Sequence, residues 1–254
     1  MVGVIMLFAA STAYAAETSS GGVTAGGMKT SQLERFQYCL YEPANAVENM
    51  PLIVYLHGHG GPQNVAELRK EKFFMNLRAG GANGTPAYIL APLLPPELDF
   101  GAKGMWPGIE PSVMELIEYV ADTYKIDRTR ISIMGTSMGG DAAIQIAANH
   151  PEVFSCLVGV IPFHYKCPIA KWEQGWGQKL ASVPTWLLIE DEGSAKTMSQ
   201  TAVDEILAAG GQAWLDVMSG ADHGSANTRI SSGMSSGQYA IFDWMISVSK
   251  PVSQ

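Results

Sequence analysis

Short segments rich in apolar, β-branched and aromatic residues alternate along this chain with segments of helical periodicity. The strand-like segments cover residues 36–41, 52–57, 87–91, 130–134, 156–161, 185–189 and 213–218. The helix-like segments cover residues 64–78, 111–124, 138–149, 198–209 and 238–248. Most strand-like segments are continuous apolar runs, which is typical of strands covered on both faces. The alternation therefore predicts an α/β protein with a mostly parallel sheet and helices on both faces.

The size and composition of the chain limit what it can be. Its 254 residues suit one domain with one core, and a hydrophobic content of 47% is enough to build that core. The net charge is −8, and the chain contains no run of basic residues. Nucleic-acid binding depends on clustered Lys and Arg, so a nucleic-acid partner is not expected. A neutral or cationic small molecule fits this background better than an anionic one.

The N-terminus has the pattern of an export signal. Residues 2–10 are nearly all apolar, and Ala13-Tyr14-Ala15 has the small residues that a signal peptidase requires. We expect residues 1–15 to be a signal peptide cut near Ala15/Ala16, and the mature protein to be secreted or periplasmic. The apolar run is too short to span a membrane, so no stable membrane insertion is expected.

Two features of the N-terminal region leave alternatives open. The first basic residue is Lys29, whereas a signal peptide normally begins with positive charge, so a buried N-terminal helix is the alternative. Residues 16–30 are rich in Ser, Gly and Thr and are interpreted as a linker. The catalytic domain is then expected to cover residues 31–254.

The strongest local motif is Gly-Thr-Ser-Met-Gly at residues 135–139, which follows one predicted strand and precedes a predicted helix. A serine in such a turn is held in a strained backbone conformation, and the flanking glycines let neighbouring backbone approach it. The hydroxyl then projects from the end of the sheet. This context predicts that Ser137 is a nucleophile.

A second glycine-rich segment, His-Gly-His-Gly-Gly at residues 57–61, follows the apolar strand at 52–56. Such a loop can direct a backbone N–H towards a developing oxyanion. The second donor is expected to be the N–H of the residue after the nucleophile. These considerations make the backbone N–H groups of His59 and Met138 the candidate oxyanion hole.

Elimination among the five histidines indicates the general base. His57 and His59 lie in the glycine-rich loop, His150 ends a helix, and His164 directly follows a strand. Only His223 follows the last predicted strand. In proteins with this type of serine turn the order along the chain is nucleophile, acid, base. His223 is therefore the expected base.

The acid should follow the strand at residues 185–189, where three carboxylates stand in a row. We predict that Asp191 is the acid, because Asp holds its carboxylate close to the backbone. Glu192 is the first alternative, and Glu190, nearest the end of the strand, is the weakest. Alternatively, all three carboxylates form an exposed charge cluster with no catalytic role.

The chain shows no sign of a metal or cofactor. No Cys-x-x-Cys or His-x-x-x-His spacing occurs, and we expect neither a metal nor a cofactor. The three cysteines cannot all pair internally. Cys39 and Cys156 are interpreted as core residues, and Cys167 either bonds to Cys156 or stays free.

These motifs together resemble the α/β-hydrolase esterases of the phospholipase/carboxylesterase and feruloyl-esterase-like type, with their dienelactone-hydrolase and polyhydroxybutyrate-depolymerase relatives. The resemblance covers residues 36–248 and rests on the segments at 56–61, 126–140 and 183–186 and on the His223 loop. It implies the α/β-hydrolase fold and hydrolysis of a small-molecule or polymer-linked carboxylic ester through an acyl-enzyme. The usual His-Gly-x-x-Asp after the penultimate strand is replaced here by Ile-Glu-Asp-Glu-Gly at 189–193.

The position of the acid follows from this resemblance by counting. Counted forward from residues 184–186 the acid falls on Gly193, and counted back from residues 208–211 it falls on Asp191. Three tryptophans, Trp106, Trp172 and Trp176, lie in connections. They are expected to border the pocket, or alternatively to pack in the core or cover a loop. A peptidase or amidase, and a non-catalytic binding protein of the same fold, remain the alternative functions.

Overall fold

The computed structural model describes residues 17–19, 22–79, 86–99, 105–191, 193–236 and 240–251. The predicted signal peptide at 1–15 and the alternative acid Glu192 lie outside these residues. In the part described, no helix is both long enough and apolar enough to cross a membrane.

The described residues form one nine-stranded sheet in the order β1-β2-β3-β5-β4-β6-β7-β8-β9. The strands are β1 (Glu17–Ser19), β2 (Val23–Met28), β3 (Phe36–Tyr41), β4 (Leu52–Leu56), β5 (Tyr88–Pro92), β6 (Ile131–Thr136), β7 (Cys156–Val160), β8 (Thr185–Glu190) and β9 (Ala213–Met218). The first three strands and β5 pair antiparallel. From β5 to β9 all neighbours are parallel. The predicted mostly parallel sheet is confirmed.

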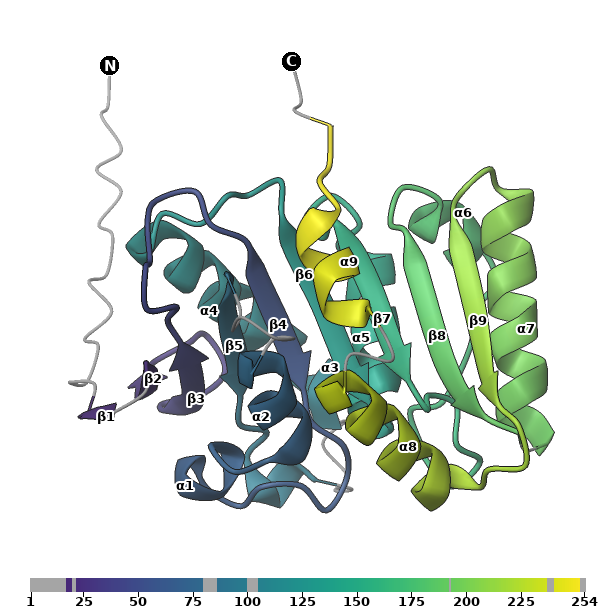
Figure 1. Cartoon of the computed structure of the whole chain (residues 1–254), viewed down its shortest axis with the longest axis horizontal. Coiled ribbons are helices and arrows are strands. Elements are labelled where there is room, and N and C mark those ends of the chain that lie inside the picture. Colours follow the sequence, from purple (N-terminus) through teal and green to yellow (C-terminus); the bar gives the residue numbers. More distant parts are fainter. Residues whose placement is uncertain are drawn as a thin grey trace, which may run out of the picture.

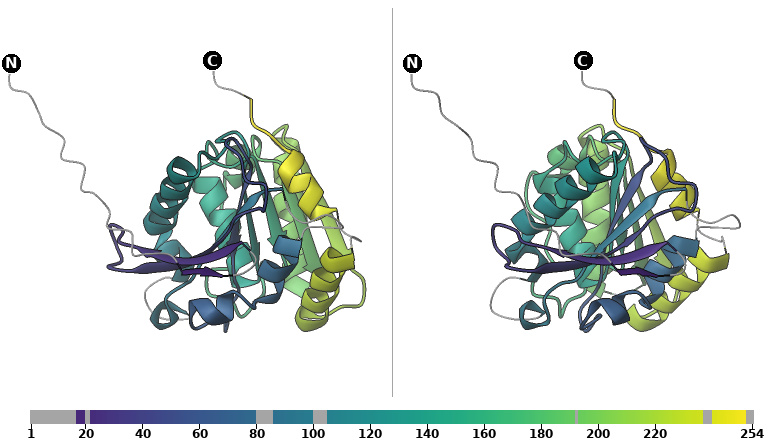
Figure 2. Two further views of the ribbon diagram at one scale, coloured as in Figure 1. Left: turned by 60° about the vertical axis from the view of Figure 1, so that its left-hand side comes forward. Right: turned by 90° about the vertical axis from the view of Figure 1, so that its left-hand side faces the viewer.

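Helices cover both faces of the sheet, as Figures 1 and 2 show. The helices are α1 (Val65–Leu68), α2 (Lys72–Ala79), η2 (Pro96–Leu98), α3 (Met105–Gly108), α4 (Glu110–Thr123), α5 (Met138–Asn149), α6 (Trp176–Leu180), α7 (Gly193–Ala208), α8 (His223–Ser236) and α9 (Ile241–Ser247). In Figure 1, α2, α8 and α9 lie in front of the sheet, whereas α4 and α5 lie behind it.

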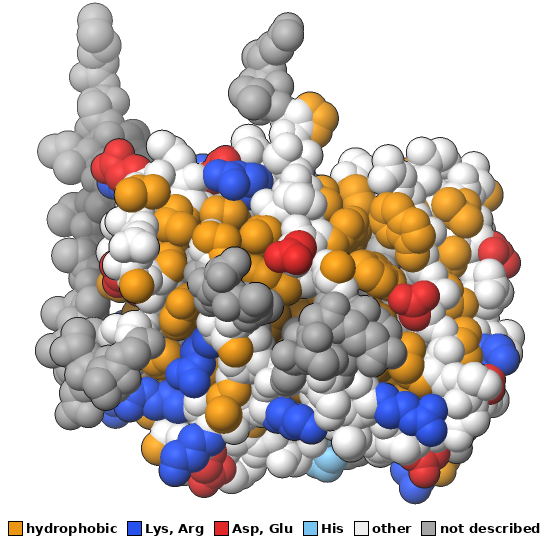
Figure 3. All heavy atoms as spheres, viewed as in Figure 1, with side chains coloured by type: hydrophobic (Ala, Val, Ile, Leu, Met, Phe, Trp, Pro, Cys, Tyr) orange, Lys and Arg blue, Asp and Glu red, His pale blue; other side chains and the backbone are white. Residues whose placement is uncertain are grey.

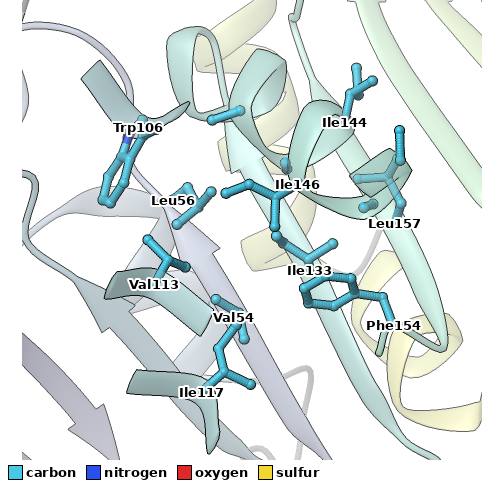
Figure 4. Close-up of a cluster of buried hydrophobic side chains, with 14 of the residues drawn as sticks. Val54, Leu56, Trp106, Val113, Ile117, Ile133, Ile144, Ile146, Phe154 and Leu157 are labelled. Carbon is cyan, nitrogen blue, oxygen red and sulfur yellow. The ribbon is translucent and has the colours of Figure 1, made fainter. Parts of the chain in front are cut away.

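Each face of the sheet carries its own hydrophobic core, because side chains of a strand point alternately to opposite faces. In β4, Leu52, Val54 and Leu56 pack into one core, and Ile53 and Tyr55 pack into the other. Figure 4 shows part of the first core, where side chains of β4 and β6 meet those of α4 and α5. This two-sided burial explains why the strands are continuous apolar runs in the sequence.

The segment interpreted as a linker is instead part of the sheet. Residues 23–28 form β2, which pairs along its whole length with β3, and β1 pairs with β2. The glycines that suggested a flexible linker have a packing role, since a Cβ on Gly26 would lie 2.4 Å from the ring of Tyr38. Gly26 and Tyr38 are cross-strand partners, so the ring occupies the space that a side chain would need.

The carboxyl ends of the parallel strands meet at one edge of the sheet, the lower edge in Figure 1. In open α/β sheets ligands bind at this edge, where the loops after adjacent strands converge. Figure 3 shows most of the Lys and Arg side chains of this view along the same lower half, and apolar side chains exposed over the upper half. The overall negative charge is therefore no guide to the charge near this edge.

Candidate active site

The serine turn joins β6 to α5, as predicted. Ser137 has φ 52° and ψ −122°, a conformation that a non-glycine residue adopts only when its surroundings impose it. A Cβ on Gly135 would lie 1.9 Å from the carbonyl oxygen of Gly139. A Cβ on Gly139 would lie 2.1 Å from the carbonyl oxygen of Leu56, in β4. Both glycines are thus required for β4, β6 and α5 to meet at the turn.

Three side chains from different strand ends form a hydrogen-bonded chain. The hydroxyl Oγ of Ser137 lies 2.9 Å from Nε2 of His223. The other ring nitrogen, Nδ1, donates to Oε1 of Glu190 at 2.9 Å. Glu190 is fully buried. With the Nδ1 proton held by the carboxylate, Nε2 is left as the acceptor for the serine proton.

The prediction that Asp191 orients His223 is wrong in this structure. Oδ1 of Asp191 accepts from the Lys196 ammonium at 2.7 Å, and Oδ2 accepts from the backbone N–H of Gly220 at 3.2 Å. The neighbouring carboxylate, Glu190, which the sequence reasoning ranked last, contacts the imidazole instead.

The direction of side chains along β8 explains this difference. Leu187 and Ile189 point into the core behind the sheet, and Leu188 points into the core in front of it. Glu190 continues the side of Leu188, where α8 begins with His223. Asp191 follows the last residue of the strand, and its carboxylate contacts Lys196 and Gly220 and not His223. Counting from family spacing predicted an acid after the strand, whereas the carboxylate that contacts His223 belongs to the last residue of the strand.

The glycine-rich loop after β4 lies directly against the nucleophile. A Cβ on Gly58 would lie 3.3 Å from Cβ of Ser137, and His59 lines the same pocket as Ser137. The Met138 N–H belongs to the first turn of α5, where backbone donors have no partner within the helix. The predicted donors therefore lie beside the nucleophile, and their role stays a prediction.

A buried histidine holds this loop in place. The Nδ1 of His57 donates to the carbonyl of Gly58 at 2.9 Å, and Nε2 accepts from the N–H of Leu94 at 3.2 Å. Burial lowers the pKa of His57, which keeps the ring neutral and able to accept. The indole N–H of Trp106 donates to the carbonyl of His57 at 3.0 Å.

None of the three tryptophans lines the pocket in front of Ser137. Trp106 is fully buried and supports the glycine-rich loop from behind, with its ring edge-on to His57 at 5.2 Å. Trp176 is also buried, whereas Trp172 lines a different groove beside α7. The pocket itself is lined by residues of the two glycine-containing motifs and by His223, and also by Phe73 and Ile161. Two of its polar residues, Glu71 and Asn227, are marked by no sequence motif.

A buried carboxyl group lies one turn along α5 from the nucleophile. Oδ1 of Asp141 accepts from the backbone N–H of Phe163 at 2.6 Å. Ile161 and Phe163 have φ angles of 44° and 64°, so this bond secures a strained loop that leads into His164. The ring of His164 contacts that of His223, with centroids 4.3 Å apart. No sequence motif pointed to Asp141.

We expect Asp141→Asn to change how stability depends on pH. Burial raises the pKa of Asp141 from 3.8 to about 7. The folded protein keeps this proton to a higher pH than the unfolded chain does. The free energy of unfolding of the wild type therefore falls as the pH rises from the unfolded pKa to about 7. Asn keeps an oxygen for the Phe163 N–H but does not ionise. The Tm of Asp141→Asn minus that of the wild type should therefore rise by roughly 5 °C between about pH 5 and pH 8. A flat difference in calorimetry would contradict this.

Two further sequence predictions concern metals and cysteines. Among the described residues, no group of three His, Cys, Asp or Glu side chains is arranged to hold a metal ion. All three cysteines are buried and free, so Cys167 forms no disulfide with Cys156.

Comparisons with known proteins bear on the fold. The model of the prolyl oligopeptidase family matches residues 111–179, which is less than half of the chain. A search of curated proteins found no match. A solved thermostable esterase superposes with a TM-score of 0.65 at 19% identity, covering 90% of this chain and 64% of its own. The chain thus spans under two thirds of that protein.

Two other solved structures are similar over most of their own length. A thermostable esterase from Pseudomonas putida gives a TM-score of 0.64 at 12% identity, covering 92% of this chain and 86% of that one. A ferulic acid esterase gives 0.61 at 16% identity, covering 84% of this chain and 96% of that one. The chain has the α/β-hydrolase fold. The superpositions show the fold alone, because sequence identities this low do not carry a reaction from one protein to another. The reaction has to be argued from the site.

Proposed function

We propose that this protein is a serine hydrolase that cleaves carboxylic esters through an acyl-enzyme. The observation that carries the proposal is the hydrogen-bonded chain from Ser137 through His223 to Glu190. It stands at the carboxyl edge of the sheet, beside a glycine-rich loop and the first turn of a helix. The esterases among the similar solved structures support an ester as the substrate.

The proposed reaction has two steps. His223 takes the proton of Ser137 while Oγ attacks the ester carbonyl, and the negative oxygen is stabilised by backbone N–H groups of the glycine-rich loop and Met138. The protonated imidazole then donates its proton to the leaving alcohol. A water molecule, activated by the same imidazole, releases the acid and restores Ser137. The carboxyl group of Glu190, hydrogen-bonded to Nδ1, stabilises the imidazolium.

A second candidate reaction is amide or peptide hydrolysis. It is favoured by the match of residues 111–179 to the prolyl oligopeptidase family. That segment contains the serine turn and α5, which esterases and peptidases of this fold share, so the match alone does not separate the two reactions.

Covalent labelling followed by a substrate comparison tests the proposal. We expect a fluorophosphonate probe to label the wild type at Ser137, and His223→Ala to be labelled far more slowly because the serine is no longer deprotonated. The labelled peptide is identified by mass spectrometry. His150→Ala is a suitable control, because that half-buried histidine pairs with Glu110 and not with the serine.

The substrate comparison uses nitrophenyl esters of increasing acyl length and the matching nitroanilides. Ester turnover well above anilide turnover supports the esterase proposal, and the reverse order supports the peptidase. No labelling of Ser137 would refute both. Activity should also survive EDTA, and recovery only on adding a divalent ion would indicate a metal site.

Export from the cytoplasm remains part of the proposal. A cut near Ala15/Ala16 would leave β1, which starts at Glu17, attached to the sheet. Mass spectrometry of the chain in the cytoplasm and in the periplasm or medium tests it, and a chain found only in the cytoplasm with an intact leader would exclude it.

A further inference from the structure

Both oxygens of one carboxylate contact the middle of the glycine-rich loop. Nδ1 of His59 donates to Oδ1 of Asp99 at 2.9 Å, and the backbone N–H of Gly60 donates to Oδ2 at 3.0 Å. The side chain of Asp99 is only 12% exposed, whereas that of His59 is 49% exposed. Asp99 therefore binds two consecutive residues of the loop from a largely buried position.

Asp99 stands on a stiff support. It directly follows η2, and its N–H donates to the carbonyl of the first residue of that helix at 3.2 Å. The Pro95-Pro96 pair fixes two backbone φ angles before it, and Leu98 is buried in the core behind the sheet. The same segment supplies the N–H of Leu94 that binds His57. This short segment thus holds the glycine-rich loop at two points.

Packing restrains two glycines of the loop but not the one between them. A Cβ on Gly58 would lie 3.1 Å from a backbone oxygen of the serine turn, and a Cβ on Gly61 would lie 2.4 Å from Nδ1 of His57. A Cβ on Gly60, which has φ 66°, would meet no atom of the described residues within 4 Å. Glycine has more backbone freedom than any other residue, so this part of the loop needs another restraint. The two hydrogen bonds to Asp99 supply it.

The restrained part of the loop is the part that the reaction requires. The backbone N–H of His59 is the predicted donor of this loop to the oxyanion, and such donors are effective when they are oriented before the reaction begins. His59 is fixed on two sides, because Asp99 binds its side chain and also the peptide N–H that follows it. A change in the backbone angles of His59 would break one or both bonds. The direction of its own N–H is therefore restricted.

We propose that Asp99 is a positioning residue for the oxyanion hole. It sets the orientation of the His59 N–H through the side chain of His59 and the N–H of Gly60. Asp99 is not among the described residues that line the pocket, so it acts through the loop and not on the substrate. This role rests on the proposed ester hydrolysis. The alternative, in which Asp99 only stabilises the fold, predicts a lower Tm with unchanged kinetic constants.

Removal of the carboxylate tests the proposal by kinetics. For Asp99→Ala we expect kcat/KM for nitrophenyl acetate to fall roughly 100-fold, mainly through kcat, because the oxyanion develops only in the transition state. Asp99→Asn should recover most of the loss. Its amide oxygen still accepts from Gly60, and its amide N–H donates to Nδ1 of the other neutral tautomer of His59. Asp122→Ala removes an exposed carboxylate of α4 as the control, and it should keep the wild-type constants.

An inhibitor separates the orientation of the donor from the stability of the fold. A trifluoromethyl ketone forms a hemiketal with a nucleophilic serine, and the negative oxygen of the hemiketal occupies the oxyanion hole. Its Ki should rise in Asp99→Ala by the same factor by which kcat/KM falls, and it should be nearly normal in Asp99→Asn. A loss of turnover without weaker binding of the ketone would overturn the proposal. Equal turnover by Asp99→Ala and the wild type would also overturn it.

Hydrogen exchange measured by NMR tests the contact without turnover. The amide of Gly60 should exchange at least about tenfold faster in Asp99→Ala than in the wild type, while the amides of β6 and α5 keep their rates. An unchanged rate at Gly60 would overturn the proposal. If the wild type cleaves no ester, the proposed reaction is wrong and the role of Asp99 falls with it, although faster exchange would still show the contact. If both proteins cleave esters equally while Gly60 exchanges faster, the reaction stands and the role of Asp99 is wrong.

Discussion

Ser137→Ala is expected to fold normally and to lose roughly four to six orders of magnitude in ester turnover. The loss is large because no other side chain can form the acyl-enzyme, and the remaining groups only stabilise the oxyanion. The hydroxyl is not part of a core, so the Tm should stay close to that of the wild type. Steady-state kinetics with a nitrophenyl ester and a thermal melt measure both quantities.

A matched serine provides the control. Ser247 lies exposed in α9, and its hydroxyl bonds only to the carbonyl of Trp244 among the contacts described. Ser247→Ala should therefore keep wild-type turnover. Near-normal turnover in Ser137→Ala, with a clean preparation, would refute the proposed nucleophile and with it the acyl-enzyme.

Glu190→Gln is expected to reduce turnover by about 10⁴, because an amide no longer fixes the working tautomer of His223 or stabilises its charged form. The side chains have the same length, so the buried position is filled in both. Asp191→Asn breaks the ion pair with Lys196, which is close to the surface, and turnover should stay within a few-fold of the wild type.

The paired variants decide between two neighbouring carboxylates. If Asp191→Asn lost about 10⁴ and Glu190→Gln kept most activity, the histidine would have to take a different partner during turnover than the one in the structure. A pH–rate profile adds a second readout, since the catalytic acid affects the histidine ionisation that the acidic limb reports.

Sequence reasoning recovered the features that depend on local pattern. Continuous apolar strands and helical periodicity predicted the parallel sheet, and the glycines around Ser137 predicted its turn, because only glycine fits where backbone meets backbone. His223 followed from the order of elements along the chain. The strands and the serine turn depend on a few adjacent residues, and His223 depends only on the order of elements in the sequence.

The errors have a common physical cause, which is contact between residues far apart in the sequence. The glycines of β2 suggested a linker, but the ring of Tyr38, from the neighbouring strand, fills the space beside Gly26. Glu190 was the weakest candidate because the sequence does not show which side chains of β8 lie on the same face of the sheet as His223. For Trp106 the sequence left the pocket and the core as alternatives, and its full burial decides for the core.

The close packing at the serine turn ties the position of Ser137 to that of the glycine-rich loop. Gly139 fits against the backbone of Leu56, so the nucleophile and the glycine-rich loop behave as one rigid unit that tolerates little variation. A side chain at position 139 would push the backbone of β4 away from the serine turn, so one substitution there should disturb the position of Ser137 and the position of the loop together.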